Sequence, residues 1–309
     1  MDHRATSRRA LLTAVALLPL AGCGEGSTPP KGSSAPRPAG SPTRSPAVSL
    51  DPAGFAALER KYKARLGLFA VATGTGATVA YRPDERFAFC STFKPLAAAA
   101  VLDRRPVSEL EKRVRIRAAD VNSISPITRK RIGSAMSLRE LCDAAIRFSD
   151  GTAGNLLVRD IGGPAALNAY LRRLGDPVTR MDDLEPELNR VGPGDPRDTT
   201  TPRAITADYR SLVLGDALPA AKRALLAGWL DRSVPGADRI RAALPPEWTI
   251  AHKTGTGDYG RAADVAVLRP PQGRPPLVLG ILSDREGYTT PPAGRLLAEA
   301  ARLVVTALA

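Results

Sequence analysis

The chain has 309 residues, 43% of them hydrophobic, so it is long enough to enclose a sizeable apolar core in one or two domains. Its formal net charge of +13 would suit a nucleic-acid-binding protein, but only 5% of the residues are aromatic and no stripe of basic and aromatic residues occurs. The composition therefore favours solvated surface charge, and we expect no nucleic-acid partner.

The first 23 residues predict an export signal. Arg8 and Arg9 precede the apolar run 10–18, as in a twin-arginine signal, and this run is too short to span a membrane. Residues 20–23 (LAGC) resemble a bacterial lipoprotein cleavage box, in which Cys23 becomes lipidated and forms the new N-terminus. The alternative is ordinary secretion with an incidental cysteine. We expect an exported protein, either a cell-envelope lipoprotein or a secreted one.

Residues 24–48 have a different composition from the rest of the chain. They are rich in serine, proline and glycine, which cannot bury enough apolar surface to fold. We therefore expect a disordered linker between a membrane anchor and one globular domain at 49–309.

The globular part is expected to have strands at its two ends and helices between them. Helical periodicity at 51–65 precedes two strands that a Gly-Thr-Gly turn joins as a hairpin, and a helix at 293–308 closes the chain. The other expected helices are 95–102, 138–147, 152–160, 165–174, 204–214 and 220–231, and the expected strands are 68–73, 77–81, 249–254, 262–268 and 277–282.

Strands from the two ends of such a chain usually pair with each other. The pattern therefore predicts an α+β fold in which one antiparallel sheet is flanked by the terminal helices. An all-helical lobe at about 84–231 is inserted into a sheet lobe that comprises about 49–83 and 232–309.

Histidine and cysteine are scarce. One of the two histidines lies in the export signal, and the three cysteines show no metal-ligand spacing, so we expect neither a metal nor a cofactor. Nothing marks His252 as the base of a Ser-His-Asp triad. A catalytic base would then be a lysine or a carboxylate.

The sequence Ser91-Thr92-Phe93-Lys94 is the first element with catalytic potential. Residues i and i+3 share a helix face, so the Lys94 amine is expected beside the Ser91 hydroxyl. A lysine can activate a serine when burial and nearby positive charge lower the lysine pKa. The N-terminus of the following helix also offers N–H groups to an oxyanion. Alone, this short motif arises easily by chance.

Two further elements have both a structural and a functional interpretation. In Ser149-Asp150-Gly151, Asp150 or Thr152 suits a helix N-cap, whereas Ser149 suits a hydroxyl relay that carries a proton to a leaving nitrogen. The run 253–257 (KTGTG) suits a strand that enters a glycine turn. It equally suits a site in which Lys253 binds a substrate carboxylate beside a close-approach glycine.

These three elements, in this order, resemble the signature of class A β-lactamases and penicillin-binding proteins. The resemblance to a class A serine β-lactamase covers essentially 51–309. A fourth element, 185–189 (EPELN), resembles the family's omega-loop motif and lies in a stretch, 176–202, with five prolines. A loop this long inside a compact domain is typically functional. The resemblance implies an α/β/α sandwich with a five-stranded sheet, an active site between the lobes and a β-lactam substrate. The sequence leaves the oligomeric state open, and we take a monomer as the default expectation.

The resemblance also implies catalytic roles. Ser91 would attack the lactam carbonyl to form an acyl-enzyme, and either Lys94, or Glu185 through a water, would take the Ser91 proton. Ser149 would pass a proton to the ring nitrogen. Glu185 and Asn189 would then hold the water that hydrolyses the acyl-enzyme, with Glu185 as general base.

Four residues would bind the substrate or the oxyanion. The resemblance assigns the substrate carboxylate to Lys253, Thr254 and Thr256, and the oxyanion to the N–H groups of Ser91 and Thr256. Arg239 stands where some members place a second carboxylate-binding arginine. The alternative is an ordinary surface arginine.

Several positions depart from the family pattern. Gly151 replaces an asparagine that binds the acylamino group of the substrate, and Ile124 replaces an aromatic residue at the rim. Asp183 replaces an arginine that pairs with the aspartate matched here by Asp198, so the omega loop must be held another way or be more mobile. His252 replaces an acidic residue, and it would either perturb Lys253 or face solvent.

The cysteines of the body are expected to be free. Cys90 has no partner because Gly257 is not a cysteine, and Ala98 offers none to Cys142. We expect both thiols to pack as small apolar side chains.

Two alternatives to a hydrolase remain. A D-alanyl-D-alanine peptidase would share the nucleophile and lysine motifs, but Glu185 and Asn189 disfavour it because they supply rapid deacylation. A sensor or scavenger would be acylated once and then signal or sequester, but no signalling segment accompanies the domain.

Overall fold

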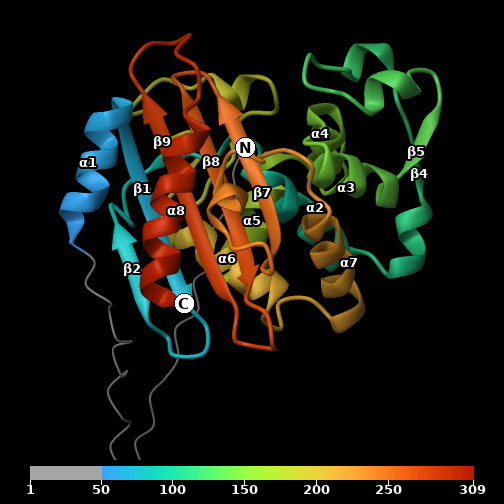
Figure 1. Ribbon diagram of the computed structural model, residues 1–309. Helices are drawn as coiled ribbons and strands as arrows, with labels where there is room; N and C mark the ends of the chain where they lie inside the picture. Colours follow the sequence, from blue (N-terminus) through green and yellow to red (C-terminus); the bar gives the residue numbers. More distant parts are fainter. Residues whose placement is uncertain (1–50) are drawn as a thin grey trace, which may run out of the picture. The chain divides into compact units, whose positions relative to one another are not determined.

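A five-stranded antiparallel sheet lies at the centre of residues 51–309, the part of the chain that the computed structural model describes (Figure 1). The strand order is β2-β1-β9-β8-β7. The first strand pairs with the last along its full length, from Ala64 opposite Arg285 to Ala72 opposite Leu277. The expected sheet and its pairing of the two chain ends are therefore confirmed. The strands are β1 (Ala64–Ala72), β2 (Thr78–Tyr81), β7 (Thr249–Gly257), β8 (Arg261–Arg269) and β9 (Leu277–Arg285).

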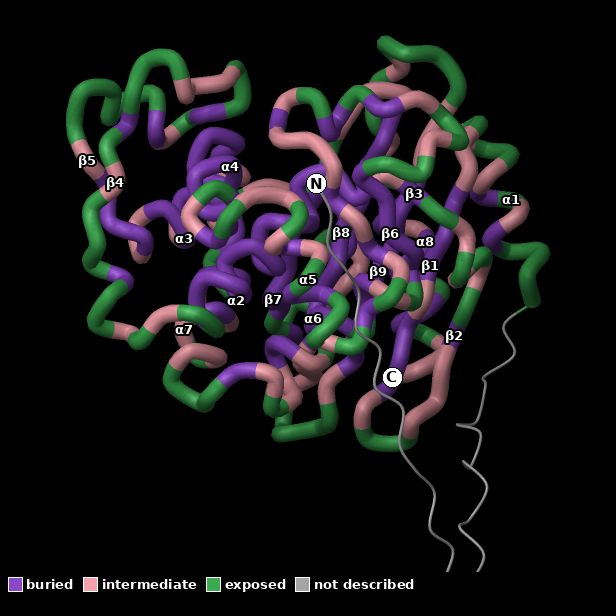
Figure 2. The backbone as a smooth tube through the Cα atoms, turned by 180° about the vertical axis from the view of Figure 1, so that it is seen from behind, coloured by how far each residue is buried: buried purple, intermediate pink, exposed green. Residues whose placement is uncertain are grey.

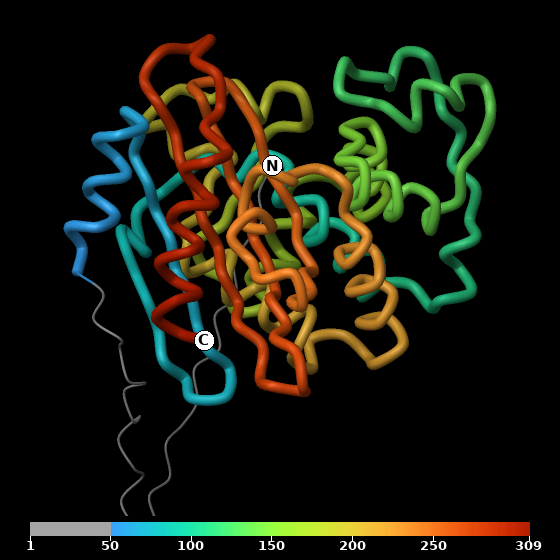
Figure 3. Tube along the Cα trace, viewed as in Figure 1, coloured from blue at the N-terminus to red at the C-terminus, as the bar shows by residue number. Residues whose placement is uncertain are grey.

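Helices cover both faces of the sheet, so its central strands are buried on both sides and read as nearly continuous apolar runs. Side chains on β1 alternate between the two layers: Leu66 and Leu68 pack with the terminal helices, and Val71 packs with the helical lobe. The terminal helices are α1 (Pro52–Tyr62) and α8 (Gly294–Leu308), and α6 (Pro202–Val213) lies against the opposite face. Figure 3 shows the chain leaving the sheet after β2 and returning to it at β7.

The remaining expected helices are also present, each within two residues of its predicted ends. They are α2 (Lys94–Arg104), α3 (Leu138–Arg147), α4 (Gly151–Asp160), α5 (Pro164–Leu174) and α7 (Ala220–Asp231). Two small sheets were not predicted because their strands are only two or three residues long. They pair β3 (Phe87–Ala88) with β6 (Thr199–Thr200), and β4 (Arg113–Arg115) with β5 (Ala135–Ser137).

The predicted helix at 51–65 is too long. The helix ends at Tyr62, and Lys63 adopts a left-handed conformation with φ 48° as its C-cap. Ala64 and Arg65 already belong to β1, where they pair with the last residues of β9. Pairing across the sheet therefore overrides the local helical periodicity.

Helix α2 is the buried centre of the helical lobe. Every residue from Lys94 to Leu102 is buried, and the helix contacts α3, α4, α5 and α7. A helix that is apolar on all sides fits only in such a position. Ser91 lies just before its first turn, so the candidate nucleophile is carried by the most enclosed helix of the lobe.

The predicted export signal, Cys23 and linker lie outside the described residues. Within residues 51–309, no helix combines the length and the apolar character needed to cross a membrane.

Candidate active site

The candidate residues of all four motifs line one cleft of about 510 Å³ between β7 and the helical lobe. The lining includes Ser91, Ser149, Asn189, Thr254 and Thr256. Lys94, Glu185 and Lys253 are buried directly beneath them. The structure therefore brings together residues that are up to 165 positions apart in the sequence.

Ser91 lies in a short 3-10 helix, η1 (Cys90–Phe93), that leads into α2. Cys90 has φ 47°, a left-handed conformation that non-glycine residues adopt only at an energetic cost. The Ser91 hydroxyl donates to Glu185 Oε1 at 2.8 Å and accepts from Lys94 Nζ at 2.9 Å. One hydroxyl thus contacts both a carboxylate and an amine.

Lys94 and Glu185 form an ion pair whose side chains are fully buried. Lys94 Nζ lies 3.0 Å from Glu185 Oε1 and also donates to the Ser149 carbonyl at 2.7 Å. Gly154 on α4 makes room for the lysine, since a Cβ there would lie 3.0 Å from Lys94 Cε. Burying two charges costs solvation free energy that their attraction only partly offsets, so a pair like this is placed for chemistry more than for stability.

Ser149 and Lys253 form the second half of the polar cluster. Lys253 Nζ donates to Ser149 Oγ at 2.9 Å and to the Thr254 carbonyl at 2.7 Å. Burial, followed by the positive charge of Lys94, lowers the pKa of Lys253 well below its usual value. The Lys253 amine can therefore release a proton far more readily than a surface lysine.

Asp150 takes the structural role that the sequence left open. It is fully buried, and its side chain caps α4 by accepting from Ala153 N at 2.8 Å. It also accepts from the N–H groups of Ile127 and Thr128 at 2.9 and 2.8 Å, which ties the rim loop to the helix. Asp150 is therefore the N-cap, and Ser149 remains available to the cleft.

Asn155 holds the backbone of Glu185, a function that none of the four sequence motifs indicates. Its amide donates to the Glu185 carbonyl at 2.7 Å and accepts from Glu185 N at 3.0 Å. Asn155 follows Gly151 by one turn of α4, on the same helix face. A buried asparagine within an apolar helix was the available signal, because asparagine disfavours helix interiors unless its side chain has a partner.

The Asn189 side chain is buried, and neither its oxygen nor its nitrogen has a partner among residues 51–309. Its backbone carbonyl is fixed by Asp258 N at 3.0 Å and by Arg261 Nη1 at 3.1 Å. Buried amides are nearly always hydrogen-bonded, so this side chain is suited to bind a water or a ligand in the cleft.

Arg239 is not an ordinary surface arginine. It is only 8% exposed, and it donates to the carbonyls of Gly255 and Ala263 at 2.7 and 2.8 Å. Its Nη2 donates to Thr256 Oγ1 at 2.6 Å. The guanidinium therefore lies beside the threonines of β7, where it can attract an anion.

His252 does not face solvent, which was one of the two expectations for it. It is fully buried, with Nδ1 at 2.9 Å from Asp264 Oδ1 and Nε2 at 2.9 Å from Arg241 Nη2. Asp264 Oδ2 also accepts from Ile240 N at 3.3 Å. This chain of contacts ties the segment that carries Arg239 to the back of β7.

Both cysteines of the described residues are free and buried. Burial raises the pKa of the Cys90 thiol to about 12. Cys90 Sγ would lie 2.9 Å from a Cβ at position 257, so glycine leaves the space that the sulfur fills. The expectation of free thiols packed as small apolar groups is confirmed.

Gly151 is required by its neighbours. A Cβ at this position would lie 2.3 Å from Glu185 Oε2 and 2.8 Å from Asn122 Nδ2. The Asn122 side chain therefore occupies space near the position where other family members carry an asparagine. Ile124, at the rim, is 41% exposed and lines the cleft.

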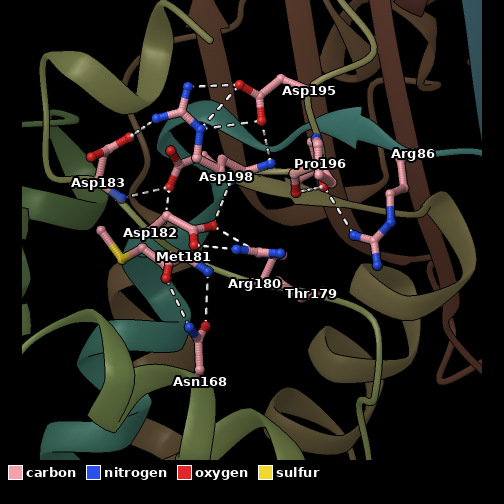
Figure 4. A network of polar contacts seen from close by, with 12 residues as sticks. Arg86, Asn168, Thr179, Arg180, Met181, Asp182, Asp183, Asp195, Pro196 and Asp198 are labelled. Atoms are coloured by element: carbon pink, nitrogen blue, oxygen red, sulfur yellow. Dashed lines mark hydrogen bonds and ion pairs between the residues drawn. The ribbon is translucent and has the colours of Figure 1, made fainter.

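The neck of the omega loop is held without an arginine–aspartate bridge between positions 183 and 198. Asp198 is buried, and its Oδ1 accepts from the backbone N–H groups of Asp182 and Asp183 at 2.8 and 3.0 Å (Figure 4). Arg180 Nε donates to Asp182 Oδ2 at 2.8 Å, and Arg197 reaches Asp183 at 3.4 Å. Of the two expectations for this loop, the structure therefore supports retention by other contacts.

The buried carboxyl of Asp198 makes stability depend on pH. Burial raises the pKa of Asp198 from 3.8 to about 6, so ionisation costs more in the folded state than in the unfolded state. The stability that the protonated Asp198 carboxyl contributes to the folded state is complete below about pH 4 and is lost as pH rises through about 6. Asp198→Asn cannot ionise, and we expect it to gain about 1–3 kcal/mol relative to the wild type between pH 4 and pH 8. Urea unfolding across this range measures the difference.

Asp195→Asn is the control from the same network. Hydrogen bonds from Arg197 lower the pKa of Asp195. The ionised Asp195 therefore stabilises the folded state above about pH 4, and this stabilisation is lost in acid. The stability of this variant relative to the wild type should therefore change with pH in the opposite direction. If the difference in unfolding free energy between Asp198→Asn and the wild type stays constant with pH, the raised pKa assigned to Asp198 is contradicted.

Comparison with known proteins identifies the family. Residues 53–308 match the model of the Beta-lactamase enzyme family. The chain is 50% identical over 316 aligned residues to a Beta-lactamase of Mycobacterium tuberculosis, covering 100% of both chains. It is 52% identical to a Beta-lactamase of Amycolatopsis lactamdurans, covering 89% of each. The crystal structure of a beta-lactamase from Desulfarculus baarsii superposes with a TM-score of 0.81 at 47% identity, covering 84% of this chain and 98% of that one. The chain therefore belongs to the beta-lactamase enzyme family and is an enzyme that hydrolyses the amide bond of β-lactam rings.

Proposed function

We propose that Ser91 is the nucleophile of this reaction and that Lys94, Ser149 and Glu185 handle its protons. One observation carries the assignment: the Ser91 hydroxyl is within hydrogen-bonding distance of both Lys94 Nζ and Glu185 Oε1. A serine needs such a neighbour to become nucleophilic at neutral pH.

Acylation joins Ser91 Oγ to the lactam carbonyl carbon, and the ring C–N bond then breaks. The direct 2.8 Å contact favours Glu185 as the acceptor of the serine proton, while the positive charge of Lys94 stabilises the developing alkoxide. The oxyanion would rest on the N–H groups of Ser91 and Thr256. Ser149 Oγ would donate a proton to the departing ring nitrogen and recover one from Lys253, whose lowered pKa suits this transfer. The proton on Glu185 would then pass through Lys94 and Ser149 to Lys253, which restores the Glu185 carboxylate before deacylation.

Deacylation uses a water between Glu185 and Asn189. The unpartnered side-chain amide of Asn189 would orient this water, and Glu185 would remove its proton as it attacks the ester carbonyl. The acyl–Oγ bond breaks, and the proton returns to Ser91. Asn155 supports this step indirectly because it fixes the Glu185 backbone.

The anionic group of the substrate would bind at β7. Thr254 and Thr256 line the cleft, and Arg239 and Lys253 supply positive charge behind them. The Thr256 hydroxyl accepts from Arg239 and would donate its own hydrogen to such a carboxylate.

Removal of Glu185 should separate the two half-reactions. In Glu185→Ala the Lys94 amine, which also contacts Ser91, would take the serine proton and keep acylation going. We therefore expect a burst of chromogenic cephalosporin cleavage of about one equivalent and then turnover slower by about 10²–10⁴-fold, because the hydrolytic water has lost its base. Stopped-flow absorbance and intact-protein mass spectrometry measure the burst and the trapped acyl group. Glu187→Ala, which removes an exposed carboxylate two residues away, is the control. Free turnover by the Glu185 variant would disprove the deacylation role.

Gly151→Ala tests the space around Glu185. Its methyl group would lie 2.3 Å from Glu185 Oε2, so the carboxylate must move. A misplacement of about 1 Å can cost about 10²-fold, and we expect kcat to fall at least tenfold. Gly192→Ala is the matched control in the omega loop, since a Cβ there meets nothing within 4 Å. Wild-type kcat in the Gly151 variant would show that Glu185 tolerates displacement.

We also propose that the chain is exported by the twin-arginine route, is lipidated at Cys23 and acts as a monomer at the cell envelope. The signal-like residues 1–23 and the Ser/Pro/Gly-rich residues 24–48 support this localisation. Cys23→Ser should move β-lactamase activity from the membrane fraction to the medium, as measured by fractionation of expressing cells. Equal activity in the medium for both forms would indicate ordinary secretion.

A further inference from the structure

The positive charge of the body is concentrated in one segment whose cations do not line the active-site cleft. Residues 51–309 carry 38 Lys and Arg and 29 Asp and Glu, a net charge of +9. Residues 112–134, here called the basic segment, carry seven of these cations and one acid, a net charge of +6. Two thirds of the net charge therefore lies in 23 residues.

The basic segment forms an exposed projection of the helical lobe. It contains β4 and leads into β5, and the backbone pairing continues through Ile116 N to the Ser134 carbonyl at 2.9 Å. All seven of its cations are exposed. Figures 1 and 2, which view the molecule from opposite sides, place β4 and β5 at one lateral end of the body and α1 at the other.

Acidic neighbours do not neutralise this charge. Glu140 is shared by Arg113 and Arg131 at 3.1 and 3.5 Å. Asp120 is likewise shared by two arginines, Arg117 of the segment and Arg159 of α4, at 3.8 and 2.6 Å.

Three cations of the segment lack even a shared acid. Among residues 51–309, no carboxylate lies within ion-pair distance of Arg115, Arg129 or Lys130. The segment thus keeps a strong positive field towards solvent.

The side chains of the segment suit a lipid surface better than a nucleic acid. Ile132 is 48% exposed and directly follows Arg131, so an apolar side chain stands among cations. Binding to a membrane surface gains both from attraction between cations and anionic lipids and from apolar area buried at the interface. The segment contains no aromatic residue on which a base could stack.

We propose that the basic segment docks the enzyme onto anionic phospholipid. In the cell, this inference rests on the envelope localisation proposed above. It adds to that localisation a preferred orientation of the enzyme on the membrane. The 27 residues between Cys23 and Asp51 can span at most about 90 Å. That reach exceeds the diameter of a domain of this size, about 45–50 Å, so a chain anchored at Cys23 can turn its far end towards the membrane.

Vesicle binding by full-length Cys23→Ser protein tests the proposal without lipidation. We expect co-sedimentation with phosphatidylglycerol-containing vesicles, little with pure phosphatidylcholine, and release at 0.5 M NaCl (about a 4–5 Å screening length). Arg115→Glu/Lys130→Glu should lower the partition coefficient at least about tenfold, since each cation near an anionic surface contributes about fivefold.

Arg60→Glu/Arg295→Glu is the matched control. It makes the same change in net charge at two exposed arginines of α1 and α8, and it keeps the same first 50 residues, so any binding by those residues cancels. We expect the partition coefficient of this control to change less than threefold. Both double variants should turn over chromogenic cephalosporin like the parent, because none of the four residues lines the cleft.

Three results would overturn the docking proposal: equal binding to the two kinds of vesicle, equal loss in the two double variants, or tighter binding to duplex DNA than to vesicles. Failure of the parent to hydrolyse β-lactams would instead count against the proposed catalytic roles and leave the vesicle result intact. Loss of membrane retention in cells with vesicle binding preserved would count against lipidation alone.

Discussion

The buried contact among Ser91, Lys94 and Glu185 determines much of the surrounding structure. Burial of a lysine and a glutamate is costly unless they stay close to each other and to further polar partners. Three separate parts of the chain supply those partners: the start of α2, the loop before α4 and the omega loop. Lys253 of β7 joins this cluster through Ser149, so the sheet lobe meets the helical lobe at this point and forms the cleft with it.

Glycine at a few positions makes this meeting sterically possible. Gly154 leaves room for the Lys94 side chain, and Gly151 leaves room for the Glu185 carboxylate. Gly255 allows β7 to approach η1, since a Cβ there would lie 2.8 Å from the Phe89 carbonyl. Larger residues would push apart groups that the reaction needs within about 3 Å. The motifs thus place glycines next to the reactive residues, because a glycine leaves space for the reactive side chain.

Much of the architecture was predictable because it depends on local patterns. Six helices of the lobe and all five strands of the main sheet follow hydrophobic periodicity, and most of their ends were predicted within two or three residues. The helix at 51–65 failed because pairing of Ala64 and Arg65 with β9 is a long-range effect. The two- and three-residue strands carry too little periodicity to detect.

The motif residues of the site were also identifiable in the sequence, but the groups that support them were not. Asn155 lies 30 residues from the Glu185 backbone that it holds, and His252 meets Asp264 only because β7 pairs with β8. Arg239 looked like any isolated arginine until the fold placed it against Thr256. Partners like these depend on three-dimensional neighbours, which spacing along one chain does not encode.

The free thiols of Cys90 and Cys142 bear on the compartments in which the enzyme can fold. Residues 51–309 reach their packed state without a covalent cross-link, so neither an oxidising nor a reducing medium is needed to complete it. A reducing and an oxidising compartment should therefore yield the same catalytic core. Ser91, Lys94 and Glu185 can come together in either one.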